Sequence, residues 1–180
     1  MLRECEVRSG RTIPGLKIRC YLDVTMGKCQ SFIESAERSV ESFKQTGIAY
    51  GHQDVKRWFL AKLRGQESPE AEGDQDSGSQ AVTRVASLVF AEHTIEDLAR
   101  LAEFLAEDKA MAAATGPLIL EALGILESHP LIGASVAGPL RQLLISRGRT
   151  GYVALYAFDA ETDQVVIHAI RHPREAGFEE

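Results

Sequence analysis

Arginine and histidine side chains gather near the C-terminal end of the chain, and they are the residues best suited to chemistry. Arg171, His172 and Arg174 follow a run of β-branched residues, and His168 lies inside that run. Guanidinium groups bind phosphate bidentately, and histidine can transfer protons near neutral pH. Three further arginines fall in the same region of the chain: Arg141, Arg147 and Arg149. Their common placement allows a local basic patch in this part of the chain.

This patch lies in an acidic protein. The chain carries 20 Lys/Arg and 26 Asp/Glu, a net charge of -6. Residues 81–180 hold eight of the basic and fourteen of the acidic residues, and eight of these acids lie between Glu92 and Glu127, away from the arginines. Proteins that work on nucleic acid present a basic face to phosphate. The net negative charge therefore disfavours a protein that acts on nucleic acid, whereas the separation of the acids from the arginines allows a local basic patch.

The arginines need strands to position them, and three apolar runs predict these strands: Leu140 to Ser146, Tyr152 to Phe158 and Gln164 to Ile170. A glycine-containing turn and a short polar turn separate the runs, as expected of an antiparallel meander. In the last strand His168 would be the outward residue of an alternating pattern.

Two helices and one more strand precede the meander. Thr94 can begin a helix, with Asp97 three residues on and an apolar stripe from Ile95 to Leu105. A second helix is predicted from about Ala110 to Ser128, with Pro117 as a kink or a late start. Val82 to Phe90 is a short apolar strand. The order β-α-α-β-β-β predicts an α+β fold, a helical hairpin packed on one face of a small antiparallel sheet.

At this point the chain resembles the RelE/ParE superfamily of toxins from bacterial toxin-antitoxin systems. The resemblance covers residues 82–178 and rests on four stretches in this order: LVFAEHTIEDLARLAEFLAE, ESHPLIG, LRQLLISRGRTGYVALY and VVIHAIRHPREAGF. It implies a cytoplasmic protein of a plasmid-stabilisation type of system, with DNA gyrase or ribosome-bound mRNA as the target.

The N-terminal third carries a second resemblance. Lys17 to Val24 predicts a strand, Cys29 to Phe43 a helix, and Asp54 to Leu63 a short helix with Asp54 as its cap. A helix, a glycine-bounded turn and a short helix are similar to the toxin-wrapping part of small type II antitoxins. This similarity implies that the short helix docks on the toxin-like part within the same chain, through Trp58, Phe59 and Leu63.

Residues 66–80 separate the two parts. This stretch has five acidic residues, no basic one and no aliphatic residue larger than alanine, so we expect a flexible linker. The domain organisation expected is an antitoxin-like segment at residues 1–65, the linker, and a toxin-like domain at residues 81–180, fused in one polypeptide.

The resemblance also implies roles for the C-terminal cluster. Members that cleave RNA use its own 2′-hydroxyl as nucleophile, so they need a base, an acid and guanidinium groups on the phosphorane. Arg171 and Arg174 stand where the family's charge-stabilising arginine lies, and His172 or His168 could transfer protons. Phe178 stands where the RelE branch has a catalytic tyrosine, and phenylalanine cannot transfer a proton. Val153 replaces that branch's arginine after its Gly-Tyr pair.

These departures favour inhibition of a target by binding, in the manner of the ParE branch. An mRNA interferase with a divergent active site, and an inert or regulatory fusion, stay open. Arg141, Arg147 and Arg149 are then the target-binding candidates. A ribbon-helix-helix that binds operator DNA through Lys17 and Arg19 is a further alternative, and so is a homodimer.

Composition bears on cofactors and location. The three cysteines, Cys5, Cys20 and Cys29, are odd in number and lack a paired spacing, which disfavours a disulfide framework or a zinc site. We therefore expect no metal and no cofactor. No stretch approaches the roughly 20 apolar residues of a membrane span, and the N-terminus lacks a signal sequence. A cytoplasmic protein without a membrane partner is the expectation.

Overall fold

The computed structural model describes residues 17–19, 30–66, 86–147 and 150–172, which hold four helices and seven strands. Their order is β1 (Lys17–Arg19), α1 (Gln30–Thr46), β2 (Ala49–Gly51), α2 (His52–Leu63), β3 (Ser87–Ala91), α3 (Glu92–Ala106), α4 (Lys109–Ser128), β4 (Ala134–Ala137), β5 (Leu140–Arg147), β6 (Thr150–Asp159) and β7 (Gln164–Arg171). The fold is α+β, as expected.

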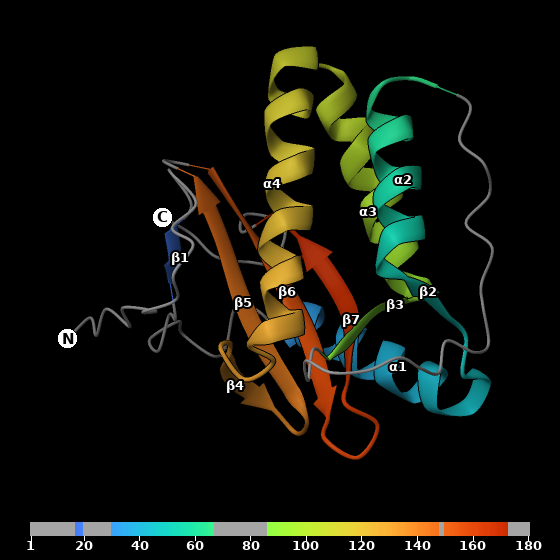
Figure 1. Ribbon diagram of the computed structural model, residues 1–180. Helices are drawn as coiled ribbons and strands as arrows, with labels where there is room; N and C mark the ends of the chain where they lie inside the picture. The colour runs from blue at the N-terminus through green and yellow to red at the C-terminus, as the bar shows by residue number, and fades with distance from the viewer. Residues whose placement is uncertain (1–16, 20–29, 67–85, 148–149, 173–180) are drawn as a thin grey trace.

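All seven strands belong to one sheet, in the order β1-β5-β6-β7-β3-β2, with β4 paired to β5 (Figure 1). The predicted antiparallel meander β5-β6-β7 is confirmed, and β3 joins it by pairing with β7 in parallel. Parallel pairing needs a crossover connection, which α3 and α4 begin. The N-terminal third contributes β1 at one edge of the sheet and β2 at the other.

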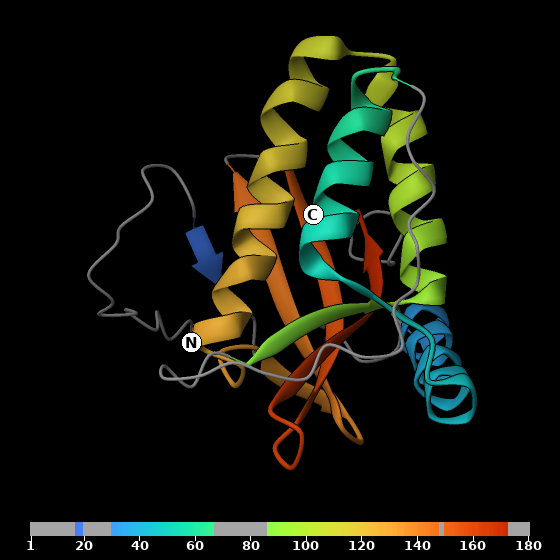
Figure 2. The ribbon, with the colours of Figure 1, turned by 45° about the vertical axis from the view of Figure 1, so that its right-hand side comes forward.

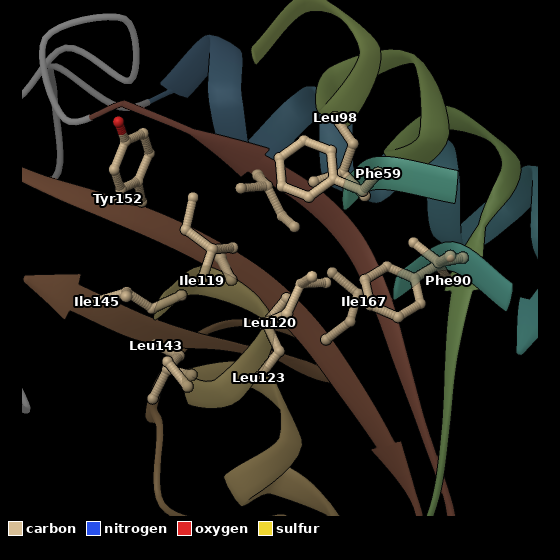
Figure 3. Close-up of a cluster of buried hydrophobic side chains, with 14 of the residues drawn as sticks. Phe59, Phe90, Leu98, Ile119, Leu120, Leu123, Leu143, Ile145, Tyr152 and Ile167 are labelled. Atoms are coloured by element: carbon tan, nitrogen blue, oxygen red, sulfur yellow. The ribbon is translucent and has the colours of Figure 1, made fainter. Parts of the chain in front are cut away.

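The helices lie on both faces of the sheet. The main core includes buried residues of α2, α3 and α4 together with β3, β5, β6 and β7 (Figure 3). A separate, smaller core lies under α1, where Phe32 and Ala36 meet Leu140, Val153, Leu155 and Ala169. Figure 2 shows α2, α3 and α4 side by side, with α1 at the foot of α3 and in a different orientation. The expected helical hairpin on one face is present, and α2 completes a three-helix layer.

A β-bulge interrupts the pairing of β6 and β7. Leu155 is opposite Ala169 and Tyr156 is opposite Ile167, which leaves His168 without a partner position on β6. On its other side β7 pairs with β3 only as far as Ile167. Beyond that point α3 takes over: the Thr94 hydroxyl donates to the Ile167 carbonyl at 2.6 Å, and the Ile170 N–H donates to Asp97 Oδ2 at 2.9 Å.

Several predicted boundaries were wrong. α3 begins at Glu92 with Ala91 as its N-cap, so Thr94 lies inside the helix. α2 begins at His52 rather than at Asp54. α4 spans Lys109–Ser128, within one residue of the prediction, and the Asp108 carboxylate accepts the N–H groups of Ala110 and Met111. Pro117 is therefore interior rather than a late start.

Two elements were not predicted. The short strands β2 and β4, of three and four residues, were not expected. α4 is long and apolar enough, by length and composition, to cross a membrane, although it contributes several buried residues to the main core. Residues 20–24 and 82–85 of the predicted strands lie outside the described residues.

Candidate functional site

Arg171 ends β7 on the face of the sheet that α1 covers. Its guanidinium carbon lies 5.2 Å from the centroid of the Phe32 ring, and its Nη2 lies 3.5 Å from the Ser35 hydroxyl. The Nε–H is buried and has no hydrogen-bond partner in the part of the chain that the structure describes. A buried donor without a partner has lost its water without replacement. The α1 contact therefore leaves this arginine incompletely satisfied.

Asp97 of α3 is the carboxylate associated with this arginine. Burial raises the pKa of Asp97, while the hydrogen bond from Ile170 and the charges of Arg100 and Arg171 lower it. Arg100 Nη2 donates to Asp97 Oδ1 at 2.8 Å. The carboxylate thus has two roles: it accepts the N–H of Ile170 at the edge of β7 that β3 leaves unpaired, and it forms an ion pair with Arg100. Arg171 acts on it only through the attraction of its charge.

His168 lies on the face of β7 opposite to Val165 and Ile167, as simple alternation predicts, but that face is not open to solvent. Its ring lies beneath α1, where it is 2% exposed. Its Nδ1 lies 3.2 Å from the buried Ser39 hydroxyl, and its ring meets Phe43 edge-on at 6.1 Å. Burial, and secondarily the Lys44 charge, lowers the pKa of His168 to about 4. A neutral, enclosed imidazole suits packing rather than proton transfer to a substrate.

His172 does not join Arg171. Successive residues of a strand point to opposite faces, and the ring of His172 meets the Tyr152 ring edge-on at 5.6 Å. Tyr152 belongs to the main core on the helical-hairpin side of the sheet, whereas Arg171 contacts α1. The predicted Arg171–His172 pair is therefore split between the two faces. Arg174 and Phe178 lie outside the described residues.

Arg141 is a structural residue of the β4–β5 corner. Its guanidinium donates to the carbonyls of Leu131 and Gly133 at 3.0 and 3.1 Å and to the Ser135 hydroxyl at 3.2 Å. These bonds hold the loop that follows α4, so Arg141 is a weak candidate for binding a target. Arg147 ends β5, and Arg149 lies outside the described residues.

The three predicted anchors of α2 face the helical hairpin. Phe59 is fully buried in the main core, and Trp58 and Leu63 pack against it. Leu63 reaches α4 at Gly116, where a Cβ atom would collide with its side chain. Lys62 lies 5.7 Å above the Trp58 ring. α2 thus packs on α3 and α4, and Trp58 stacks on Phe59 at 6.5 Å between ring centroids. The antitoxin character of this segment stays a prediction.

Sequence reasoning missed Phe32, Ser39 and Asp97 as partners of the C-terminal cluster. Ser39 carried a usable signal, because it is a polar residue three positions after Ala36 and four before Phe43 on the apolar face of α1. Asp97 was interpreted as the partner of a helix cap, although it occupies the same side of the helix as Leu101 four residues on. Phe32 was correctly predicted on the apolar face of α1, but its contact with Arg171 was not predicted.

A shallow hollow lies between α1 and the start of α3, lined in part by Ser39, Phe43 and His93. Among the described residues, no group of three His, Cys, Asp or Glu side chains could hold a metal ion.

Comparison with known proteins adds no relative: no family model, curated protein or solved structure matches the chain.

Proposed function

We propose that the chain is a type II toxin-antitoxin protein in which residues 81–180 form a toxin-like domain, covered by a fused antitoxin-like segment at residues 1–65. The toxin-like domain acts by binding a target such as DNA gyrase. One observation carries the proposal: the described part of the N-terminal segment wraps residues 86–172 on both faces and both edges of the sheet.

The α2 contact supports the covering role. Val55 and Phe59 are fully buried among residues of the C-terminal part, and β2 extends the sheet by pairing with β3. Buried aromatic anchors commonly dominate binding between separate proteins. A segment joined through such anchors has the character of a bound partner that shares one chain with its target.

The α1 contact supports the inhibitory side of the proposal. α1 lies on Arg171, the residue that the RelE/ParE resemblance singles out, through Phe32 and Ser35. While α1 stays in place, it covers part of this side chain, which is only half-buried. Displacement of α1 would therefore enlarge the surface that the arginine can offer to a target.

Binding is favoured over RNA cleavage by the placement of the proton-transfer candidates. His172 lies against Tyr152 on the opposite face from Arg171, and His168 is enclosed and neutral. A general base must come within hydrogen-bond reach of the proton that it removes. Neither histidine stands beside Arg171 in an accessible position, so a cleavage mechanism centred on this arginine lacks its partner among the described residues.

The test is expression toxicity. Residues 81–180 alone should arrest growth, and co-expression of residues 1–66 should relieve the arrest, while the full chain should be harmless. The Arg171→Ala fragment serves as the control and should lose toxicity with an unchanged circular dichroism spectrum. Inhibition of gyrase supercoiling by the purified fragment supports target binding, whereas ribosome-dependent mRNA cleavage would support the interferase. A folded, soluble fragment without toxicity would contradict both and leave an inert fusion.

A further inference from the structure

The smaller core under α1 differs in composition from the main one. α1 contributes two fully buried apolar side chains, Phe32 and Ala36, and the partly buried Ile33 and Val40. The same interface encloses a polar pair, Ser39 and His168. An element held by few buried apolar contacts opens at a lower free energy than the global core. α1 is therefore the helix most easily released from the described sheet.

The connection at the end of α1 allows such a movement. The helix ends at Thr46, and Gly47 follows with φ +67°, a left-handed conformation that glycine adopts without strain. A Cβ atom at Gly47 would meet nothing within 4 Å, so the surroundings of this position are open. Ile48 then leads into β2. A single glycine beside an unpacked position is a suitable hinge between α1 and the sheet.

The charge of Arg171 is poorly matched by α1. The nearest α1 groups are the Phe32 ring and the neutral Ser35 hydroxyl, at the long distance of 3.5 Å. No carboxylate of the described part of α1 forms an ion pair with Arg171, since Glu34, Glu37 and Glu41 lie on the exposed side of the helix. The Nε–H is unpaired as well. A carboxylate at the Ser35 position would supply the charge-assisted bidentate bond that arginine favours.

We propose that the sheet face beneath α1 is a binding site for an acidic amphipathic helix, with Arg171 pairing its carboxylate, and that α1 is a hinged cover that gives way to this helix. The inference rests on the proposed function, since it names the partner chemistry of the covered face. The partner presents an aromatic residue to the Phe32 position and an aspartate or glutamate three residues later. Its apolar side lies on Leu140, Val153, Leu155 and Ala169.

Hydrogen exchange of the full chain tests the cover. Peptides from α1 should exchange at least ten times faster than peptides from β6 and α4. Phe32→Ala should accelerate exchange in α1 alone, while Phe104→Ala, which removes the same side chain from an exposed site on α3 (60% exposed), should leave α1 unchanged. Phenylglyoxal should modify Arg171 faster in Phe32→Ala, with Arg141 as the internal reference. Equal protection of α1, β6 and α4 from exchange would contradict the proposal that α1 is a hinged cover.

The carboxylate test compares two variants of equal charge. In the full chain, Ser35→Asp should slow α1 exchange about tenfold, whereas Ser31→Asp, on the exposed side of α1, should not. A labelled peptide of residues 30–46 carrying Ser35→Asp should bind the Phe32→Ala protein at least ten times tighter than the Ser31→Asp peptide. Arg171→Gln should abolish that difference. Equal binding of the two peptides, or none, would overturn the site; neither readout depends on toxicity, so a harmless fragment would count against the proposed function alone.

Discussion

His168 shows how a covering helix changes the chemistry of a strand residue. α1 encloses its ring, and burial holds its pKa near 4, below the ordinary value of 6.5. The folded state therefore binds the proton less tightly than the unfolded state. Above about pH 6.5 this histidine is neutral in both states and costs no stability. As the pH falls from 6.5 toward 4, the unfolded state binds a proton that the folded state does not, so the free energy of unfolding decreases by an amount on the order of 3 kcal/mol.

This linkage can be measured by urea unfolding between pH 4.5 and 7.5. The wild-type free energy of unfolding should decrease with falling pH, and His168→Asn, which keeps a polar atom near Ser39, should flatten that decrease. His93→Asn is the control, because His93 lies on the surface of α3 with 48% of its side chain exposed. An identical slope in wild type and His168→Asn would show that another group controls the pH dependence.

Gly133 is the position at which the smallest change should be most harmful. Its N–H donates to the Tyr156 hydroxyl at 2.9 Å, and a Cβ atom would lie 2.6 Å from both that hydroxyl and the Gln142 carbonyl. Overpacking of a rigid site typically costs about 1–3 kcal/mol. Gly133→Ala should lower the free energy of urea unfolding by about that amount, whereas Gly51→Ala, where the new atom makes an ordinary contact with Asp54 at 3.5 Å, should change it by no more than roughly 0.5 kcal/mol.

At the scale of elements, side chains of α3 make the hydrogen bonds to β7 that a neighbouring strand would otherwise make. After β3 stops at the level of Ile167, the hydroxyl of Thr94 and the carboxylate of Asp97 satisfy the open edge of β7. An unsatisfied buried carbonyl costs about 1–3 kcal/mol. Thr94→Val, which keeps the shape and removes the hydroxyl, should therefore lower the free energy of thermal unfolding by about that much, and Thr94→Ser should restore most of it. Equal stability of the two variants would mean that the bond to Ile167 contributes nothing.

The same contact explains which elements were predictable. The meander and the two long helices follow from local periodicity in runs of seven or more residues, and the structure contains them. Thr94 was predicted as a helix cap but lies inside α3. A Thr followed by an acid three residues later satisfies the capping pattern whether or not the helix begins there. The real partner of Thr94, Ile167, is 73 residues away. The strands β2 and β4 were missed because three or four residues carry too little periodicity.

The candidate site was predictable only in part, for a reason that belongs to the whole molecule. Arg171 was found from its position after the last strand, but its burial depends on α1, which comes from the other end of the chain. The burial of His168 likewise depends on α1, which covers this face of β7 through Ser39 and Phe43. Residue type and spacing therefore located the strand that matters, whereas the partners of its side chains depend on contacts more than 100 residues apart, as in Ser39 with His168 (129) and Ser35 with Arg171 (136).

The described parts of residues 1–65 and 81–180 form the two sides of one interface. β2 pairs with β3, and Val55 and Phe59 are buried among α3 and α4. If a specific protease site is placed within residues 66–80 and cut, the two pieces should still co-elute in size-exclusion chromatography at micromolar concentration, because the contacts do not require the covalent link.

Phe59→Ala is the variant that makes this experiment decisive. Deleting a fully buried phenylalanine typically costs about 3–5 kcal/mol, which at one factor of ten per 1.4 kcal/mol weakens association by roughly two to three orders of magnitude. The cut Phe59→Ala chain should therefore separate into fragments at the concentration that keeps the cut wild type together. Phe104→Ala, on the exposed side of α3, should co-elute like the wild type. Separation of the cut wild type would instead show that the linker itself holds the two parts together, and the antitoxin-like segment would not be an independent binding partner of the toxin-like domain.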